Sequence, residues 1–173
     1  MQRMLNVGIA LIAKPALLIL DEPTAGIDQK ARKQLHQTLL ALKAQGLAIM
    51  LTTHDLDDAK RLADRVAILA RGQLLAQGSV SDLIKQRFAS LREVRVHWSQ
   101  GQSSPEQQAR LKAAQLHEER EGLWSGLLAN NDGKLDALLK ELLAEESAGP
   151  DVTVREPGLD ILIQSLINKP EAA

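Results

Sequence analysis

The sequence predicts an α/β fold in which helices cover a parallel sheet, followed by a small α+β module. Residues 17–20 (LLIL) and 47–51 (LAIML) are continuous apolar runs, typical of strands buried on both faces. Between them, leucines recur at helical spacing over residues 29–44, with Asp28 as N-cap and Gly46 as a C-terminal stop. These three segments predict one βαβ unit.

Further elements flank this unit in the first half of the chain. Residues 5–13 predict a short buried helix, which Pro15 ends. A second helix is expected over 56–63. Residues 65–70 and 73–77 are typical of a hairpin, and a helix is expected from Ser79 to about Arg87.

The composition changes near residue 89, which predicts a second domain. Residues 92–98 (REVRVHW) alternate as a strand with one solvated face. A polar helix from Ser104-Pro105, a strand over 123–128, a helix over 135–146, a strand over 151–155 and a helix over 159–167 complete a β-α-β-α-β-α module. We therefore expect domains at 1–88 and 89–173.

The composition excludes several classes of function. With 21 Lys+Arg against 22 Asp+Glu the net charge is −1, which argues against a nucleic-acid partner. The absence of cysteine excludes disulfide scaffolds, thiol catalysis and Cys-ligated metal clusters. No apolar stretch reaches the ~18 residues of a membrane-spanning helix, so we expect any membrane connection to come through a partner.

The chemistry of the sequence is concentrated where the two buried strands end. Asp21 and Glu22 follow the first strand, at the edge where open α/β sheets bind ligands. One carboxylate can hold Mg²⁺ through its water shell and the other can orient or deprotonate a water. Taken alone, the pair is equally consistent with carboxylates that merely end a strand. His54 follows the second strand, and parallel pairing brings it to the same edge as a hydrogen-bond donor for phosphate.

These strings together resemble the ATP-binding subunits of ABC transporters, members of the P-loop NTPases. LLILDEPTAGID resembles the family's Walker B strand, catalytic glutamate and D-loop, and LTTHD resembles its switch-histidine loop. RVAILARGQLLAQGS is similar to the hairpin that follows, and Met1-Gln2-Arg3 to the tail of the signature motif. The module from residue 90 onward, with Arg155-Glu156-Pro157-Gly158-Leu159-Asp160, resembles the accessory domain of drug- and antibiotic-exporter ATPases.

The resemblance implies a role for each residue of these motifs. Glu22 would polarise the attacking water, His54 would contact the γ-phosphate of ATP, and Asp21 would support Mg²⁺, through water. Asp28 would face the nucleotide site across a dimer with a second ATP-binding subunit. The implied function is ATP hydrolysis that drives transport through a membrane-spanning partner subunit, at the cytoplasmic face of the cell membrane.

The phosphate-binding half of such a site is missing from the sequence. No G-x-x-x-x-G-K-[ST] string is present, and Gly133-Lys134 lies in a polar turn without the upstream glycine. We expect a partial P-loop NTPase fold with only the Walker B half, part of a longer subunit. The isolated chain is accordingly expected to bind ATP weakly and to be inactive.

Two other functions fit parts of the sequence. DNA-repair and chromosome-organising ATPases use a similar Walker B string, and a truncated product could act as a non-catalytic interaction module. Outside the motifs, we expect His36, His97 and His117 to be solvated, residues 118–121 to form a solvated helix end, and Trp98 and Trp124 to lie in the core.

Overall fold

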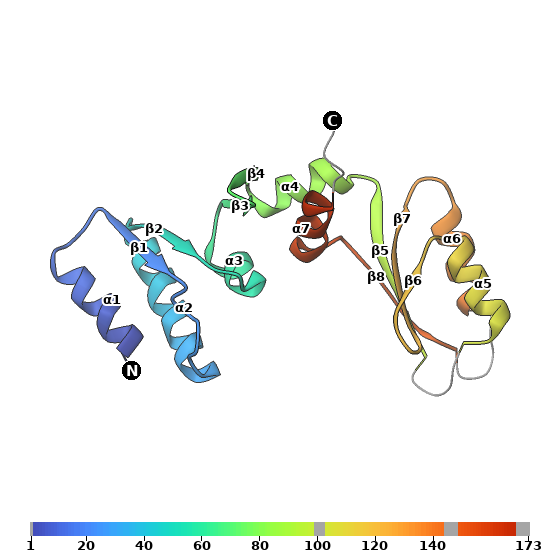
Figure 1. Ribbon diagram of the computed structural model, residues 1–173, viewed down its shortest axis with the longest axis horizontal. Coiled ribbons are helices and arrows are strands. Elements are labelled where there is room, and N and C mark those ends of the chain that lie inside the picture. Colours follow the sequence, from blue (N-terminus) through green and yellow to red (C-terminus); the bar gives the residue numbers. More distant parts are fainter. Residues whose placement is uncertain (1, 99–102, 144–148, 169–173) are drawn as a thin grey trace. The chain divides into compact units, whose positions relative to one another are not determined.

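The computed structural model describes residues 2–98, 103–143 and 149–168 of the chain (Figure 1). It divides into two compact units, Met1–Ala67 and Ile68–Ala173, and the boundary falls inside a strand, β3. The expected domain division between residues 88 and 89 stays a prediction. No helix among the described residues is both long and apolar enough to cross a bilayer.

The first unit is the predicted βαβ arrangement, preceded by a helix. Its elements are α1 (Gln2–Ile12), β1 (Leu17–Asp21), α2 (Gln29–Ala44), β2 (Ala48–Thr52) and α3 (Leu56–Leu62). Strands β1 and β2 pair in parallel, from Leu17 opposite Ala48 to Asp21 opposite Thr52. Of the signature-like tail, Met1 lies outside the described residues, and the two residues after it begin α1.

Helix α2 begins and ends where the sequence indicates. The Asp28 carboxylate accepts a hydrogen bond from the Ala31 N–H at 2.9 Å, which satisfies one of the free donors of the first turn. Gly46 follows the helix with φ +91°, a conformation that favours glycine. The buried face of α2, with Leu35 and Leu39, packs in a core that includes Val7, Leu18 and Leu62.

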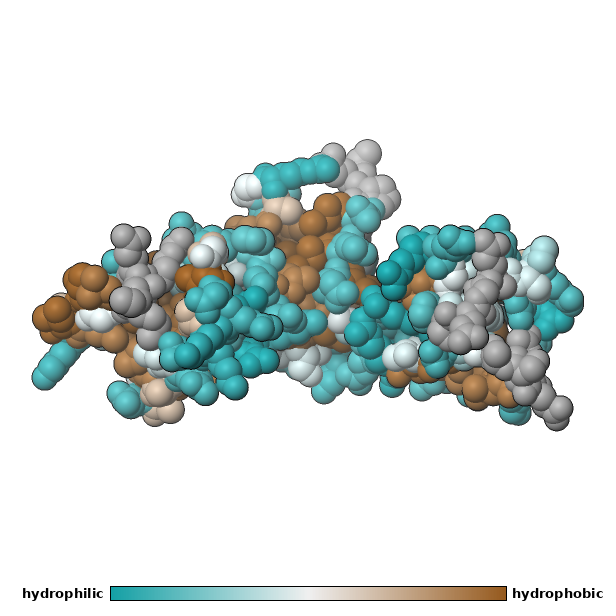
Figure 2. Space-filling view, turned by 90° about the horizontal axis from the view of Figure 1, so that it is seen from below, coloured by the Kyte–Doolittle hydropathy of each residue, from teal (hydrophilic) through white to brown (hydrophobic). Residues whose placement is uncertain are grey.

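Two expectations for this unit are wrong. The strands are not buried on both faces: Leu18 is 3% exposed, whereas Ile19 is 66% and Met50 58% exposed. Helix α1 is also not a buried helix, because only Val7 among its described side chains is buried while Ile12 is 79% exposed. Figure 2 shows apolar side chains gathered at its left end, over the first unit. Within the described residues, helices cover only one face of the sheet.

A hairpin that contains the boundary between the units, and then a helix, come next in the chain. Strands β3 (Val66–Ala70) and β4 (Gln73–Gly78) form a two-stranded sheet, joined by Arg71 and Gly72 with φ of +51° and +75°. Two successive positive φ values are those of the type I′ turn that suits a two-residue hairpin. Helix α4 (Val80–Phe88) follows, capped by the Ser79 hydroxyl, which accepts from the Asp82 N–H.

The rest of the second unit is a four-stranded antiparallel sheet with accompanying helices. Its elements are β5 (Leu91–His97), α5 (Pro105–Ala113), β6 (His117–Arg120), β7 (Leu123–Ala129), α6 (Lys134–Leu143), β8 (Asp151–Arg155) and α7 (Leu159–Ile167). The spatial order β6-β7-β5-β8 with β-α-β-β-α-β connection is the ferredoxin-like arrangement. The end of the helix expected over 135–146 lies outside the described residues.

Two expectations for this module are corrected by the structure. Residues 117–120 form strand β6, not a helix end, so the module has one strand more than we expected. The outer face of β5 is not simply solvated, since the Glu93 side chain is 2% exposed. It accepts hydrogen bonds from Arg95 at 2.6 Å and from Arg155 on β8 at 2.8 Å. Paired in this way, a carboxylate can be buried.

The core of the module lies between the sheet and helices α5 and α6. It contains both tryptophans, as expected, together with Val94, Val96 and leucines of the two helices. The backbone of Gly126 on β7 approaches the turn before β6 so closely that a Cβ there would lie 3.0 Å from the Gln115 carbonyl oxygen and 3.1 Å from the Leu116 Cα. Both obstacles are backbone atoms, which cannot move aside as a flexible side chain does.

We therefore expect Gly126→Ala to destabilise the second unit by about 1–3 kcal/mol, the usual cost of overpacking. Urea unfolding followed by tryptophan fluorescence measures this, because Trp98 and Trp124 both lie in that unit. Gly8→Ala in α1 is the control, since apart from its chain neighbours and the backbone of its own helix nothing lies within 4 Å of the place that its Cβ would take. Equal midpoints for Gly126→Ala and the unchanged chain would contradict the proposed close approach.

Candidate functional site

The carboxyl ends of β1 and β2 carry the residues that the sequence singles out. Because Asp21 lies opposite Thr52 in the parallel register, the residues that follow the two strands emerge side by side. The Thr52 hydroxyl donates a hydrogen bond to the Asp21 carboxylate. It also accepts one from the Glu22 N–H at 3.2 Å, and the same N–H donates to the Thr52 carbonyl oxygen at 3.1 Å.

Glu22 turns sharply away from the strand. Its φ of +43° is uncommon for a residue with a side chain, and such conformations concentrate at functional sites. The turn brings the Glu22 Oε1 to 2.9 Å from the His54 Nδ1, across 32 positions of sequence. The structure thus brings together three of the four predicted site residues: Asp21, Glu22 and His54.

The pair formed by Glu22 and His54 is open to solvent. The His54 side chain is 83% exposed and the Glu22 side chain 33%. The hydrogen bond to Glu22, and then the charge of that carboxylate, raise the pKa of His54 above its ordinary value. The charged His54 therefore stabilises the folded chain fully below pH ~6.5, the ordinary pKa of histidine. This stabilisation is lost as the pH rises through the raised pKa of His54.

Asp28 lies apart from this group, at the start of α2. Its carboxylate is exposed and is held by the Ala31 N–H, and this hydrogen bond lowers the pKa of Asp28. The structure thus shows a helix-capping role for Asp28. Among the described residues it shows no hydrogen bond between Asp28 and the other three.

Beneath the exposed residues lies a buried polar cluster that the sequence analysis missed. Its centre is Asp58 on α3, with a side chain 1% exposed. Asp58 accepts hydrogen bonds from the Thr24 hydroxyl and from Arg32, whose Nε lies 2.9 Å from Oδ1, and His36 Nε2 lies 2.7 Å from the same oxygen. His36 is thus buried and paired, contrary to our expectation of a solvated side chain.

Arg32 links this cluster to the loop that carries His54. Its guanidinium lies 2.7 Å from Asp55, the residue after His54, and 2.5 Å from Asp58. Asp55 also caps α3, and the contact with Arg32 lowers the pKa of Asp55. On the other side, Thr24 belongs to the loop that follows Glu22. The cluster thus fixes both loops of the site to α2 and α3.

A sequence signal for this cluster existed, in the form of acidic Asp58 on the face of a short helix that also carries Leu62. Thr24, the two α2 residues Arg32 and His36, and Asp58 come from three separate segments of the chain, however. Their approach depends on the packing of α2 against α3. Periodicity of a single helix does not reveal such a contact.

The chain is similar in sequence to several known proteins. The chain is 35% identical over 116 residues to the daunorubicin/doxorubicin resistance ATP-binding protein DrrA of Streptomyces peucetius, covering 67% of this chain and 34% of that protein. It is 45% identical over 85 residues to the Nod factor export ATP-binding protein I of Neorhizobium galegae, covering 49% of this chain and 24% of that protein. This chain is homologous to the ATP-binding proteins of ABC transporters.

Other similar proteins belong to the same group. The linearmycin resistance ATP-binding protein LnrL of Bacillus subtilis is 40% identical over 83 residues, which are 48% of this chain and 27% of that protein. A solved ATP-binding subunit of an ABC transporter is 39% identical over 43% of this chain and 31% of its own, with a TM-score of 0.40. No family model matches the chain. The chain spans about a third or less of the length of the curated relatives it matches.

The donor set at the edge of the sheet is compatible with Mg²⁺. Asp21 and Thr52 offer a carboxylate and a hydroxyl, the hard oxygen donors that Mg²⁺ prefers, and Asp21 is exposed. Within the described residues, however, no group of three or more His, Asp or Glu side chains is arranged to hold a metal ion.

We expect Asp58→Ala to destabilise the first unit by about 3–5 kcal/mol, because it leaves Arg32 and His36 without their buried acceptor. Both tryptophans lie in the second unit, so fluorescence does not report on this change. The measurement is instead the hydrogen exchange of the Leu35 and Leu39 amides in α2, which slows when the first unit is stable. Asp57→Ala is the matched control, since Asp57 is the exposed neighbour on the same helix. Unchanged protection in Asp58→Ala would contradict the role of the cluster.

We also expect Glu22→Gln to lower the pKa of His54 toward 6.5, because the variant removes the charge that stabilises the imidazolium. Titration of the His54 ring protons by NMR measures the shift, and the missing signal in His54→Gln assigns the resonance. Glu141→Gln, which removes an exposed carboxylate on α6, should leave the titration unchanged. A His54 pKa that is the same in Glu22→Gln as in the unchanged chain would exclude the pair in solution.

Proposed function

We propose that this chain is the C-terminal portion of an ATP-binding subunit whose complete form binds and hydrolyses ATP to power export across a membrane. The observation that carries the proposal is the hydrogen-bonded pair of Glu22 and His54, beside Asp21, at the carboxyl edge of the parallel strands. The sequence identity to ATP-binding proteins named for drug resistance, linearmycin resistance and Nod factor export supports the same function.

In this proposal the exposed residues divide the work of hydrolysis. Glu22 accepts a hydrogen bond from the attacking water and so orients and polarises it. His54 donates to an oxygen of the γ-phosphate, and its contact with Glu22 holds the ring at the site. Asp21, aligned by the Thr52 hydroxyl, would hold a Mg²⁺ through water, and that ion would neutralise phosphate charge.

In this proposal, other segments and subunits supply the remaining parts of the nucleotide site. The sequence contains no G-x-x-x-x-G-K-[ST] loop, so the backbone cradle and lysine for the β- and γ-phosphates belong to another segment of the complete subunit. Asp28 at the start of α2 faces a second ATP-binding subunit across the nucleotide. A membrane-spanning partner receives the motion, so the subunit works at the cytoplasmic face of the cell membrane.

The buried cluster around Asp58 gives this arrangement its rigidity. It holds the loop after Glu22 through Thr24 and the loop after His54 through Arg32 and Asp55. The His54 side chain is 83% exposed and has little packing of its own, so its position relative to Glu22 depends on the loops. A catalytic pair must be held within a fraction of an ångström to be effective.

The test is a chimera in which this chain replaces the matched segment of the Streptomyces peucetius relative, restoring the phosphate-binding half. We expect the chimera to hydrolyse ATP, and Glu22→Gln to reduce turnover about 100-fold or more while ATP binding is kept, the scale of a lost general base. Glu141→Gln, remote from the site, is the control. Equal turnover in Glu22→Gln and the parent chimera would refute the role of Glu22.

The isolated chain gives a second measurement. We expect titration with a fluorescent ATP analogue to show no saturable binding in the micromolar range, because the phosphate cradle is missing. Micromolar affinity that survives Asp21→Asn would contradict the proposal that nucleotide binding needs another segment. A chimera that binds ATP without hydrolysing it would instead favour the non-catalytic interaction module.

A further inference from the structure

The two edge strands of the ferredoxin-like sheet differ in how they are protected. An edge strand exposes unpaired N–H and C=O groups, and proteins usually shield it with charges, bulges or proline. Strand β6, at one edge, consists of His117-Glu118-Glu119-Arg120, is exposed throughout, and has a register shift between Glu118 and Arg120. This edge carries two of the usual defences.

Strand β8, at the other edge, has an apolar centre and no bulge. Its sequence is Asp151-Val152-Thr153-Val154-Arg155, with regular pairing to β5 over all five residues. All of these residues except Val152 are exposed, and no strand of the described chain lies along the outer side of β8. β-Branched residues, which are enriched in strands, fill its centre.

The sequence of β8 is complementary to itself in the antiparallel direction. If a second copy pairs with its two-fold axis at Thr153, Asp151 lies opposite Arg155 of the second copy, and Val152 lies opposite Val154. Each charged pair joins a carboxylate to a guanidinium, and each valine pair is of the kind that stabilises neighbouring strands. A shift of the register by two residues loses both charged pairs.

The side chains around β8 are compatible with this contact. Arg155 donates to Glu93 through Nε and Nη2, which leaves further N–H donors of the guanidinium for an Asp151 from a second copy. Its side chain is 47% exposed. On the side of the sheet that faces the helices, Val154 is 39% exposed. Pairing would bury apolar surface at Val154 in both copies.

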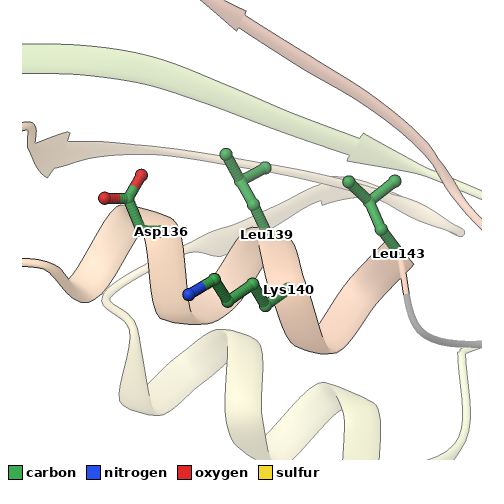
Figure 3. A pocket seen from close by; sticks show the side chains of 4 residues that line it. All are labelled: Asp136, Leu139, Lys140 and Leu143. Atoms are coloured by element: carbon green, nitrogen blue, oxygen red, sulfur yellow. The ribbon is translucent and has the colours of Figure 1, made fainter.

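Helix α6 carries apolar side chains on the same side of the sheet as Val152, since Leu139 and Val152 pack against the same core. A shallow depression is lined by Asp136, Leu139, Lys140 and Leu143, and Figure 3 shows Leu139 and Leu143 directed from α6 toward the strands. Leu143 is 70% exposed, although leucine at the end of an amphipathic helix is normally covered. The exposed leucine and the open strand thus belong to the same side of the module.

We propose that β8 is a self-association edge, at which two copies of this chain join their four-stranded sheets into one continuous antiparallel sheet with the two-fold axis at Thr153. The contact is small, so the association is weak for the isolated chain. It strengthens when another contact already holds two copies together, because the local concentration is then high.

Disulfide trapping tests the position of the axis, since the chain contains no native cysteine. In the proposed pairing the two Thr153 Cα atoms lie about 4.5–5.5 Å apart, within the range of a disulfide. The two copies of Asp151 lie about 13 Å apart along the strands. Under mild oxidation we therefore expect Thr153→Cys to form a covalent dimer, and Asp151→Cys to remain monomeric.

Glu118→Cys on β6 is the control for exposed edge strands, and it should also remain monomeric. Sedimentation over a concentration series then compares the unchanged chain with Val154→Lys, which puts a charge at the paired edge and should abolish the dimer. Circular dichroism checks that each variant is folded. Equal cross-linking at positions 118, 151 and 153, or a dimer that is insensitive to Val154→Lys, would overturn the proposal and assign self-association to another surface.

Discussion

The parallel pairing of β1 with β2 is the contact on which the rest of the first unit depends. Its register sets Asp21 opposite Thr52, and the polar contacts of the exposed site follow from that alignment. A shift by one residue would turn Leu18 out of the core and move the site residues to the wrong side of the strand. Because parallel strands need a crossover, helix α2 is part of the same constraint. The site therefore exists only when the whole βαβ unit is folded.

The first unit is covered on one side and open on the other. Leu18 and the leucines of α2 form its core, whereas Ile19 and Met50 point away from that core and remain exposed. A continuous apolar strand is normally covered on both faces, and exposed surface of this kind marks a contact with other protein. In the proposed function, the exposed face and the absent phosphate-binding loop have one explanation, because another segment of the complete subunit supplies both the cover and the loop.

Each of the two units contains a buried carboxylate with hydrogen-bond donors around it. In the first unit a buried aspartate, Asp58, fixes loops that carry exposed polar residues. In the ferredoxin-like sheet a buried glutamate, Glu93 on β5, joins its strand to β8 through Arg155 and also pairs with Arg95 of its own strand. In both cases the carboxylate is tolerated away from water because each oxygen has a donor. Both clusters connect residues from separate elements, so each acts on tertiary structure and not on a single helix or strand.

The sequence by itself determined the elements that depend on local patterns. The apolar runs, the Asp28 and Ser79 caps and the Arg71-Gly72 turn each specify structure over a few neighbouring residues, and the strands and helices around them are where we predicted. The approach of Glu22 to His54 was also predictable, because parallel pairing brings strand ends to one edge. Only the tertiary structure decided that His36 and Glu93 are buried, that residues 117–120 form a strand, and that one face of the apolar strands is open. These outcomes depend on which distant residues supply donors, strand partners or cover, and the periodicity of a single helix or strand does not reveal those partners.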